Sequence, residues 1–246
     1  QFLSTITADK ICRIGTGEFT DSLMIDEQTA LSQLLIQRCA GHKNIFLELK
    51  TKSSNIEHLL DVEDKGNAVI AWSLNTPRNI EKYEFGTASL AERLNAAQKA
   101  SEAGYWVSFH FDPVIRYAGW EREYAQVLEQ IFSRIDHRKI LWISVGGFRF
   151  TREFKGTMRE HFPNEDITLD EFVPCPDGKL RYFKPLRIEI YSLFRDIISR
   201  QTDAPFLYMC MESADMWDLV FGKDYSSSDD LEREMIEFVR VKTGMS

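Results

Sequence analysis

Residues 68–74 read AVIAWSL, a nearly continuous apolar run in the first half of the chain. Such a run is typical of a strand that is buried on both faces, as the strands of parallel sheets are. A helical pattern follows, in which Ser89 and Glu92 form a possible capping box and Gly104 can end the helix. Residues 105–112 (YWVSFHFD) return to a strand pattern. This order of strand, helix and strand indicates a parallel α/β sheet.

The same alternation extends in both directions along the chain. Further strands are predicted at residues 11–20, 44–51 and 140–145, and further helices at residues 26–39, 53–60 and 120–135. Strand–helix units in series predict parallel strands that lie side by side in sequence order. The pattern alone leaves an open sheet and a barrel as alternatives. Polar residues at the strand ends favour a partial (β/α) barrel over residues 1–162.

The periodic pattern changes in the last third of the chain. Residues 166–183 contain several proline and glycine residues and predict a loop or a hairpin. Helices are predicted after Pro185 and Ser228, with a strand at residues 206–211 between them. We therefore expect residues 163–246 to form a helical and β extension that packs on the barrel.

Composition and charge limit the classes of function. The chain has 246 residues and a formal net charge of -8, so a broad basic surface for nucleic acid is not expected. No apolar run approaches the roughly 20 residues that cross a bilayer, and the first residues lack a secretory pattern. We therefore expect a cytoplasmic protein without a membrane partner. The chain begins at Gln1 rather than Met, which we interpret as a sign that it was cut from a longer protein.

The four cysteines are scattered. They are Cys12, Cys39, Cys175 and Cys210. None has a second cysteine at the short spacing that metal sites favour, so we predict free thiols and no metal ligand in this chain.

Polar side chains recur where the predicted strands end. Ligands of parallel α/β folds bind outside the carboxyl ends of the strands, so these residues are candidates for a site. The set comprises Glu18, Thr20, Asp21, Glu48, Lys50, Lys52, Ser73, Asn75, His110, Asp112, Gly146, Gly147 and Arg149. Lysine, serine and asparagine can hold a carboxylate, and aspartate can hold an amine or ribose hydroxyls, so the mixture suits a zwitterionic ligand with a ribose.

Each candidate also has an ordinary structural alternative. Thr20 or Asp21 can cap the next helix, Asn75 can shape a turn, and His110 can be a core histidine. The basic residues from Arg149 to Arg159 can contact phosphate or can form a solvated helix face.

At these positions the chain resembles the spore photoproduct lyase family, among the DNA repair photolyase-like radical S-adenosylmethionine (SAM) enzymes. The likeness covers roughly residues 11–162. It is carried by RIGTGEFTDSLMID at 13–26, Lys52 with IEHLLD at 56–61, AWSLN at 71–75, GTASLAERLNAAQKASEAGY at 86–105, GWEREY at 119–124 and the tripeptide RFT at 149–151.

The resemblance implies two cofactors for the full-length protein. In radical SAM enzymes, a CxxxCxxC loop after the first barrel strand holds a [4Fe–4S] cluster, SAM completes the fourth iron, and reductive cleavage gives a 5′-deoxyadenosyl radical. The strands predicted here would be barrel strands two to six. The chain starts after the cluster motif, so none of its own cysteines would retain the cluster.

The resemblance also implies roles for single residues. Thr20 and Asp21 match the family's Ser-Asp pair at the SAM site. Lys52 and Ser73 match its SAM-contacting lysine and serine, and Asn75 is nearby. We expect His110, Asp112 and Arg149 to contact the substrate, for which a nucleic acid or a nucleotide is a candidate.

Glu18 departs from the family pattern. In spore photoproduct lyase, a cysteine two residues before the Ser-Asp pair donates a hydrogen atom, and a carboxylate has no weak S–H bond to give. We therefore expect a lyase-like radical SAM enzyme that does not repair thymine dimers by the lyase route. Glu18 would orient a polar substrate or transfer a proton, or would pair with Lys50 or Arg13.

Two other functions stay open. One is a non-catalytic barrel that binds a nucleoside or a partner. The other is a TIM-type hydrolase or aldolase that uses Glu18, Lys50 or Lys52, and Asp112. We expect the full-length protein to be an enzyme, and this chain alone, without the cluster-binding segment, to be inactive.

Overall fold

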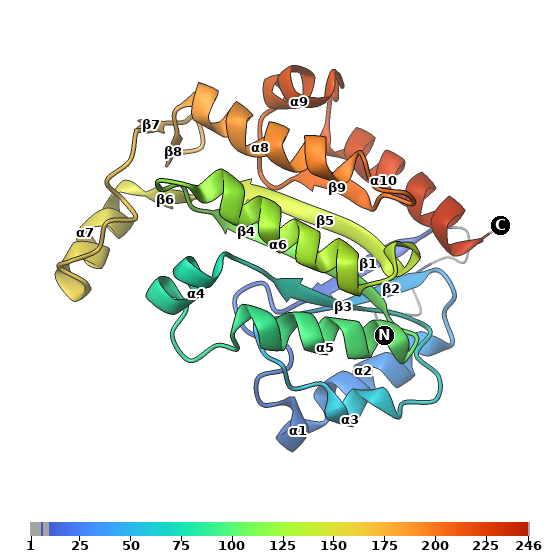
Figure 1. Cartoon of the computed structure of the whole chain (residues 1–246). Coiled ribbons are helices and arrows are strands. Elements are labelled where there is room, and N and C mark those ends of the chain that lie inside the picture. Colours follow the sequence, from blue (N-terminus) through green and yellow to red (C-terminus); the bar gives the residue numbers. More distant parts are fainter. Residues whose placement is uncertain (1–5, 7–9, 246) are drawn as a thin grey trace.

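Six parallel strands form one curled sheet (Figure 1). The computed structural model describes residue 6 and residues 10–245. The strands are β1 (Cys12–Thr16), β2 (Ile45–Thr51), β3 (Asn67–Ser73), β4 (Trp106–Val114), β5 (Ile140–Gly147) and β9 (Phe206–Met209). The first five strands pair in sequence order, and β9 then pairs with β5. The predicted partial (β/α) barrel with parallel strands is confirmed.

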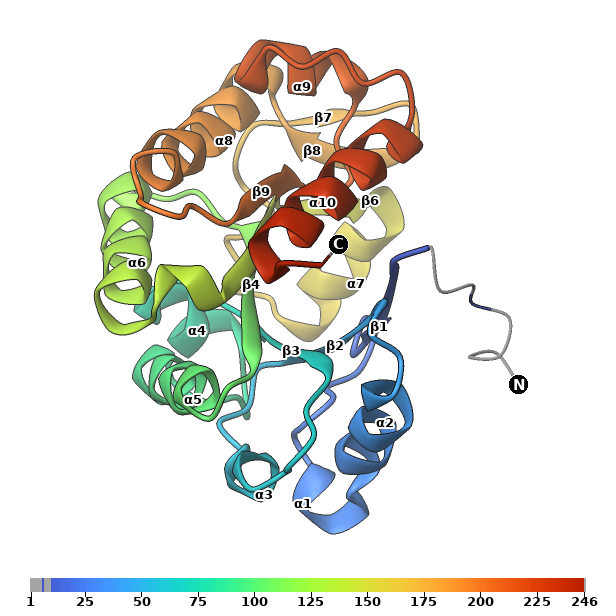
Figure 2. The same cartoon turned by 90° about the vertical axis from the view of Figure 1, so that its right-hand side faces the viewer.

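Helices cover the outer face of this sheet, as Figure 2 shows. They are α2 (Leu31–Ala40), α3 (Glu57–Leu60), α5 (Leu90–Glu102), α6 (Trp120–Arg134) and α8 (Lys184–Ile198). Alternate residues of each strand point to this face, and Leu47, Ile70 and Phe109 are fully or almost fully buried in its core. A strand between two covered faces carries few polar residues, which explains the continuous apolar runs of the sequence.

The inner face of the sheet has two halves. Near the amino ends of the strands, Phe46 and Trp142 pack with Leu231 and Val239 of α10 (Ser228–Thr243). Near the carboxyl ends, the inward positions carry mostly polar side chains. Figure 2 shows α10 lying in front of the inner face. A helix from the end of the chain therefore covers the apolar half and leaves the polar half to the loops.

The segment after β5 forms a small second sheet. It contains β6 (Arg149–Thr151), α7 (Arg152–His161), β7 (Phe172–Pro174) and β8 (Lys179–Tyr182), and β8 pairs antiparallel with both β6 and β7. Of the two alternatives predicted for residues 166–183, a loop or a hairpin, the structure shows a hairpin. The remaining helices of the described residues are α1 (Asp26–Thr29), α4 (Pro77–Tyr83), α9 (Ala214–Phe221) and a 3₁₀ turn, η2 (His137–Lys139). The domain boundary expected at residue 162 stays a prediction.

Several predicted boundaries are wrong. The first strand ends at Thr16, because Gly17 adopts φ +80° and the chain turns. The helix predicted at residues 26–39 is broken at Ala30, which has φ 50°. The break occurs because the Asp26 carboxylate accepts a hydrogen bond from the Ser32 N–H at 3.0 Å. The helix predicted at 53–60 begins only at Glu57, and α4 was not predicted.

None of the helices in the described residues has the length and apolar content that crossing a bilayer requires. Residues 1–5, part of the stretch in which a secretory pattern was sought, lie outside the described residues.

The capping box at the start of α5 generates a stability prediction. Ser89 Oγ accepts the Glu92 N–H, and the Glu92 carboxylate accepts the Ser89 N–H. We expect Ser89→Ala to lower the free energy of unfolding by about 1 kcal/mol, because one helical N–H loses its partner. The measurement is urea unfolding followed by circular dichroism. Ser133→Ala, at an exposed position of α6, is the matched control, and an equal effect of the two changes would refute the cap.

Candidate functional site

The structure brings the predicted site residues to one end of the sheet. Glu18, Thr20 and Asp21 follow β1, Lys52 follows β2, Ser73 ends β3, Asn75 follows it, His110 and Asp112 lie on β4, and Arg149 begins β6. Ser73 pairs with His110 in the β3–β4 ladder, and His110 pairs with Ser144 of β5. Their binding roles stay predictions. Their side chains differ in how many of their polar groups form hydrogen bonds or ion pairs within the protein.

The Asp21 carboxylate is fully engaged within the protein. Oδ1 accepts the Thr51 hydroxyl at 2.6 Å and the N–H groups of Leu23 and Met24 at 2.9 Å. Oδ2 accepts the Lys52 N–H at 2.6 Å. Asp21 therefore ties the loop after β1 to the end of β2, and it positions neighbouring residues.

Asn75 is also engaged, and it is only 2% exposed. Its Oδ1 accepts from Tyr124 Oη at 2.6 Å, from Asn79 Nδ2 at 2.9 Å and from the Thr76 N–H at 3.0 Å. Its Nδ2 donates to the Pro113 carbonyl at 3.2 Å. Both ends of the amide are used, so Asn75 fixes the turn between β3 and α4.

Thr20, Lys52 and Ser73 are the candidates with polar groups to spare. Thr20 is exposed and Ser73 is half-buried, and no described residue forms a hydrogen bond with either hydroxyl. The Lys52 ammonium lies 3.2 Å from Glu84 Oε1, and its side chain is 36% exposed. One ion pair uses one of the three N–H donors of a lysine. These three side chains can therefore contact a ligand at the carboxyl ends of β1, β2 and β3.

Glu18 forms an ion pair. Lys50 Nζ lies 3.2 Å from Glu18 Oε2, and the Glu18 side chain is 78% exposed. This arrangement matches the alternative in which Glu18 pairs with Lys50. Arg13, the other partner considered, instead points across the inner face toward Tyr208 and Met235.

Glu48 is a buried carboxylate in the barrel interior. It is 5% exposed, and its Oε1 accepts from His110 Nε2 at 2.7 Å, Trp142 Nε1 at 2.8 Å and Ser108 Oγ at 3.1 Å. A carboxylate only accepts here, so His110 Nε2 carries a proton. Burial by itself would raise the pKa of Glu48, but His110, Arg13 and the Trp142 hydrogen bond outweigh it and lower the pKa to about 2. Glu48 is therefore a permanent anion that orients the His110 ring.

Asp112 and Arg149 form a bidentate ion pair at 2.9 and 3.0 Å. Arg149 Nη2 also lies 3.6 Å from Cys210 Sγ, at the end of β9. Burial, reinforced by Asp112, raises the pKa of the Cys210 thiol to about 12, so the thiol stays protonated. The pair joins β4 to β6 at the edge of the polar half of the inner face that is formed by these two strands.

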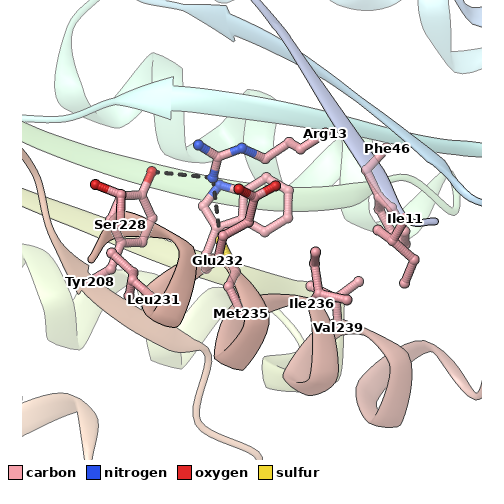
Figure 3. Close-up of a pocket in the computed structure, with 11 residues that line it drawn as sticks. Ile11, Arg13, Phe46, Tyr208, Ser228, Leu231, Glu232, Met235, Ile236 and Val239 are labelled. Carbon is pink, nitrogen blue, oxygen red and sulfur yellow. Dashed lines mark hydrogen bonds between the residues drawn. The ribbon is translucent and has the colours of Figure 1, made fainter. Parts of the chain in front are cut away.

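The inner face also contains a cavity of 320 Å³ near the amino ends of the strands, lined by residues of the sheet and α10. Figure 3 shows Arg13 reaching into it. Its guanidinium lies 5.3 Å from the Trp142 ring centroid and 5.7 Å from that of Tyr208. None of the predicted site residues lines this cavity. It is thus separate from the candidate site.

Two residues of the site were not predicted. Glu84 directly follows the last residue of α4, and Arg93 lies in the first turns of α5 with a fully buried side chain. The sequence contains a signal for Arg93. It follows Leu90 by three residues and precedes Ala97 by four, so it lies on the apolar face of the helix. A charge on that face must be buried and paired.

The family model for spore photoproduct lyase matches residues 5–175 of the chain. Spore photoproduct lyases from Clostridium acetobutylicum and Bacillus subtilis are 32% and 29% identical over 150 and 174 residues. These matches cover 58% and 67% of this chain, and 44% and 51% of the relatives. The chain therefore spans about half the length of the curated relatives that it matches.

Solved structures of spore photoproduct lyase are similar in fold. A cysteine-to-alanine mutant superposes with a TM-score of 0.75 at 26% identity, covering 83% of this chain and 63% of that one. A second mutant, with bound AdoMet and dinucleoside spore photoproduct, gives 0.73 at 25% identity with the same coverage. The match covers most of the half-barrel.

The buried Glu48 generates a prediction about acid stability. The pKa of Glu48 is about 2 in the folded protein and ~4.3 in the unfolded chain. Its contribution to the free energy of unfolding is therefore fully present at pH values above the unfolded pKa. That contribution is lost as the pH falls toward the folded value. We expect Glu48→Gln to destabilise the protein most above about pH 4.5, with a pH-dependent part on the order of 3 kcal/mol.

The measurement is urea unfolding of wild type and variant between about pH 6 and pH 3. The difference between the two should shrink as the pH falls. Glu63→Gln, at an exposed position before β3, serves as the control and should show no such trend. Parallel stability curves for wild type and Glu48→Gln would contradict the assignment.

Proposed function

The chain belongs to the spore photoproduct lyase family, and on that premise we propose that it forms the SAM-binding barrel of a radical SAM enzyme. One observation carries the proposal. Thr20, Lys52 and Ser73, which the family resemblance assigns to SAM, lie at the carboxyl ends of three adjacent strands with polar groups to spare. Ligands of parallel barrels bind at this end. A structural relative with bound AdoMet supports the same ligand class.

The donor chemistry of these residues fits the amino acid and ribose parts of SAM. Lys52 would hold the carboxylate, and Thr20 and Ser73 would hold hydroxyl or ammonium groups. Asp21, whose carboxylate is engaged, would act by fixing Lys52 and the loop after β1. Asn75 would act in the same way, by fixing the end of β3.

When bound beside a [4Fe–4S] cluster, SAM supplies a 5′-deoxyadenosyl radical to the substrate. In the described residues, no group of three or more His, Cys, Asp or Glu side chains is placed to hold a metal ion. We propose no cluster ligand among these described residues. The cytoplasmic location expected from the sequence remains a prediction.

The substrate is proposed to be a nucleotide-like molecule that reaches His110, Asp112 and Arg149. A relative with a bound dinucleoside spore photoproduct supports this class. We propose that the enzyme does not repair that lesion by the thiol route, because Glu18 stands where the resembling enzyme has its hydrogen-donating cysteine. Glu18 carries a negative charge beside Lys50, so it can orient a polar group or accept a proton.

Lys52→Ala tests the ligand assignment. We expect the affinity for S-adenosylhomocysteine to fall about ten- to a hundredfold, because a charged hydrogen bond to the ligand carboxylate is lost. The measurement is calorimetry on the protein at the full length that its gene encodes. Lys43→Ala, an exposed lysine before the opposite end of β2, is the matched control. Equal affinities of wild type and Lys52→Ala would remove Lys52 from the site, and binding without any turnover would favour a non-catalytic barrel.

Glu18→Cys tests the departure from the lyase route. We expect the full-length, cluster-loaded wild-type protein not to convert a spore photoproduct dinucleotide, and the variant to gain conversion, because a thiol can give a hydrogen atom to a carbon radical. The measurement is chromatography of the reaction products. Glu27→Cys, at an exposed position of α1, is the control for an added thiol. Efficient repair by the wild type would disprove the proposed role of Glu18.

A further inference from the structure

One carboxylate lies between two cations beside the candidate adenosyl site. Glu84 Oε1 lies 3.2 Å from Lys52 Nζ, and Glu84 Oε2 lies 2.8 Å from Arg93 Nη2. The Glu84 side chain is 8% exposed, and that of Arg93 is 0% exposed. The contact between Glu84 Oε2 and Arg93 lacks hydrogen-bond geometry, so it is an interaction between charges.

Arg93 forms no ion pair with any other described residue. Its hydrogen bonds go to neutral acceptors: Nε to the Ala88 carbonyl at 2.8 Å, Nη1 to the Ser73 carbonyl at 2.8 Å and Nη2 to Thr87 Oγ1 at 2.7 Å. A buried guanidinium requires a counterion, since leaving it unpaired is strongly destabilising. The charge of Glu84 is therefore committed to Arg93.

Lys52 is left with a positive charge that its surroundings balance only in part. The Asp21 carboxylate accepts the Lys52 backbone N–H and three other hydrogen bonds, and it forms no ion pair with the Lys52 ammonium. The cluster of Lys52, Glu84 and Arg93 thus carries one net positive charge. Of its two cations, only Lys52 is exposed.

We propose that Glu84 determines which acidic group the candidate adenosyl site accepts. With Glu84 in place, the site matches one negative charge, such as the carboxylate of an S-adenosyl amino acid. Without it, Lys52 and Arg93 would form a doubly charged pair suited to the dianionic phosphate of an adenine nucleotide. The carboxylate thereby selects against nucleotides by repulsion. This inference rests on the proposed function, since it concerns the same site.

The direction of the expected change in ligand affinity follows from Coulomb's law. Removing a negative charge favours every anionic ligand at Lys52, and it favours a dianion about twice as strongly as a monoanion. In Glu84→Gln, we expect the preference for S-adenosylhomocysteine over AMP to fall about tenfold at low ionic strength. The affinity for adenosine, which carries no charge, should stay unchanged. Added salt should reduce the effect.

The measurement is calorimetry of the three ligands with the full-length protein, near pH 8, where the phosphate is dianionic. Glu84→Asp keeps the charge and should keep the preference of wild type. Glu81→Gln removes an exposed carboxylate from α4, one turn earlier, and should also behave as wild type. Equal changes in affinity for S-adenosylhomocysteine and AMP in Glu84→Gln would overturn the inference.

Glu84→Gln leaves a buried arginine without its counterion, so a second variant covers the case in which it does not fold. Phe85→Lys adds a positive charge at a position that is 72% exposed, beside Glu84. It should shift the preference toward AMP in the same direction. An unchanged preference in this variant would count against the charge argument.

A separate readout distinguishes this inference from the proposed function. If none of the three adenosine ligands binds, the proposed function fails. The charge argument is then tested by thermal unfolding in inorganic phosphate and in acetate. Phosphate should stabilise Glu84→Gln more than it stabilises wild type, and acetate, a monoanion, should show the same difference in a weaker form. Equal stabilisation of both proteins by phosphate would refute the inference.

Discussion

The Glu48 carboxylate cross-links three strands of the curled sheet. It projects from β2 and bonds to Ser108 and His110 of β4 and to Trp142 of β5, so it reaches over β3. In a flat sheet, β4 would lie about 9.5 Å and β5 about 14 Å from β2, so the curl of the sheet shortens the distances that these contacts span. The inward position of β3 beside Ser108 is Ala71, whose small side chain leaves room for the carboxylate. The position of every residue on the polar inner face depends on this curvature.

The sequence predicts the strands well because each buried strand is itself a run of apolar residues, which can be recognised without knowing its neighbours in space. The apolar run at residues 68–74 and the capping box of Ser89 are local patterns, and both correspond to elements of the structure. The break at Ala30 was not predictable in the same way. It depends on Asp26, whose carboxylate is also bonded to His58, thirty-two residues away. Local periodicity contains no information about that contact.

The same distinction applies to the candidate site. The positions of the strand ends predicted where polar side chains gather. They did not predict which of these side chains form hydrogen bonds within the protein. Asp21 and Asn75 are engaged by Thr51 and Tyr124, which come from other elements. Glu84 lies in a loop whose path no pattern in the sequence predicts. Residue type therefore indicates the chemistry of the site, and the tertiary contacts decide which groups remain available.

The parallel order of the sheet has a consequence for the time course of folding. No two neighbouring strands of this sheet are joined by a hairpin, so every pairing closes a loop that includes at least one helix. The longest closure joins β5, which ends at Gly147, to β9, which starts at Phe206. Contacts between residues far apart in the sequence form slowly, because closing the loop costs conformational entropy before the contacts can stabilise the chain. On this basis α10 packs on the inner face late in folding. Phe46 and Trp142 are therefore exposed during the early stages, when they can contact other chains.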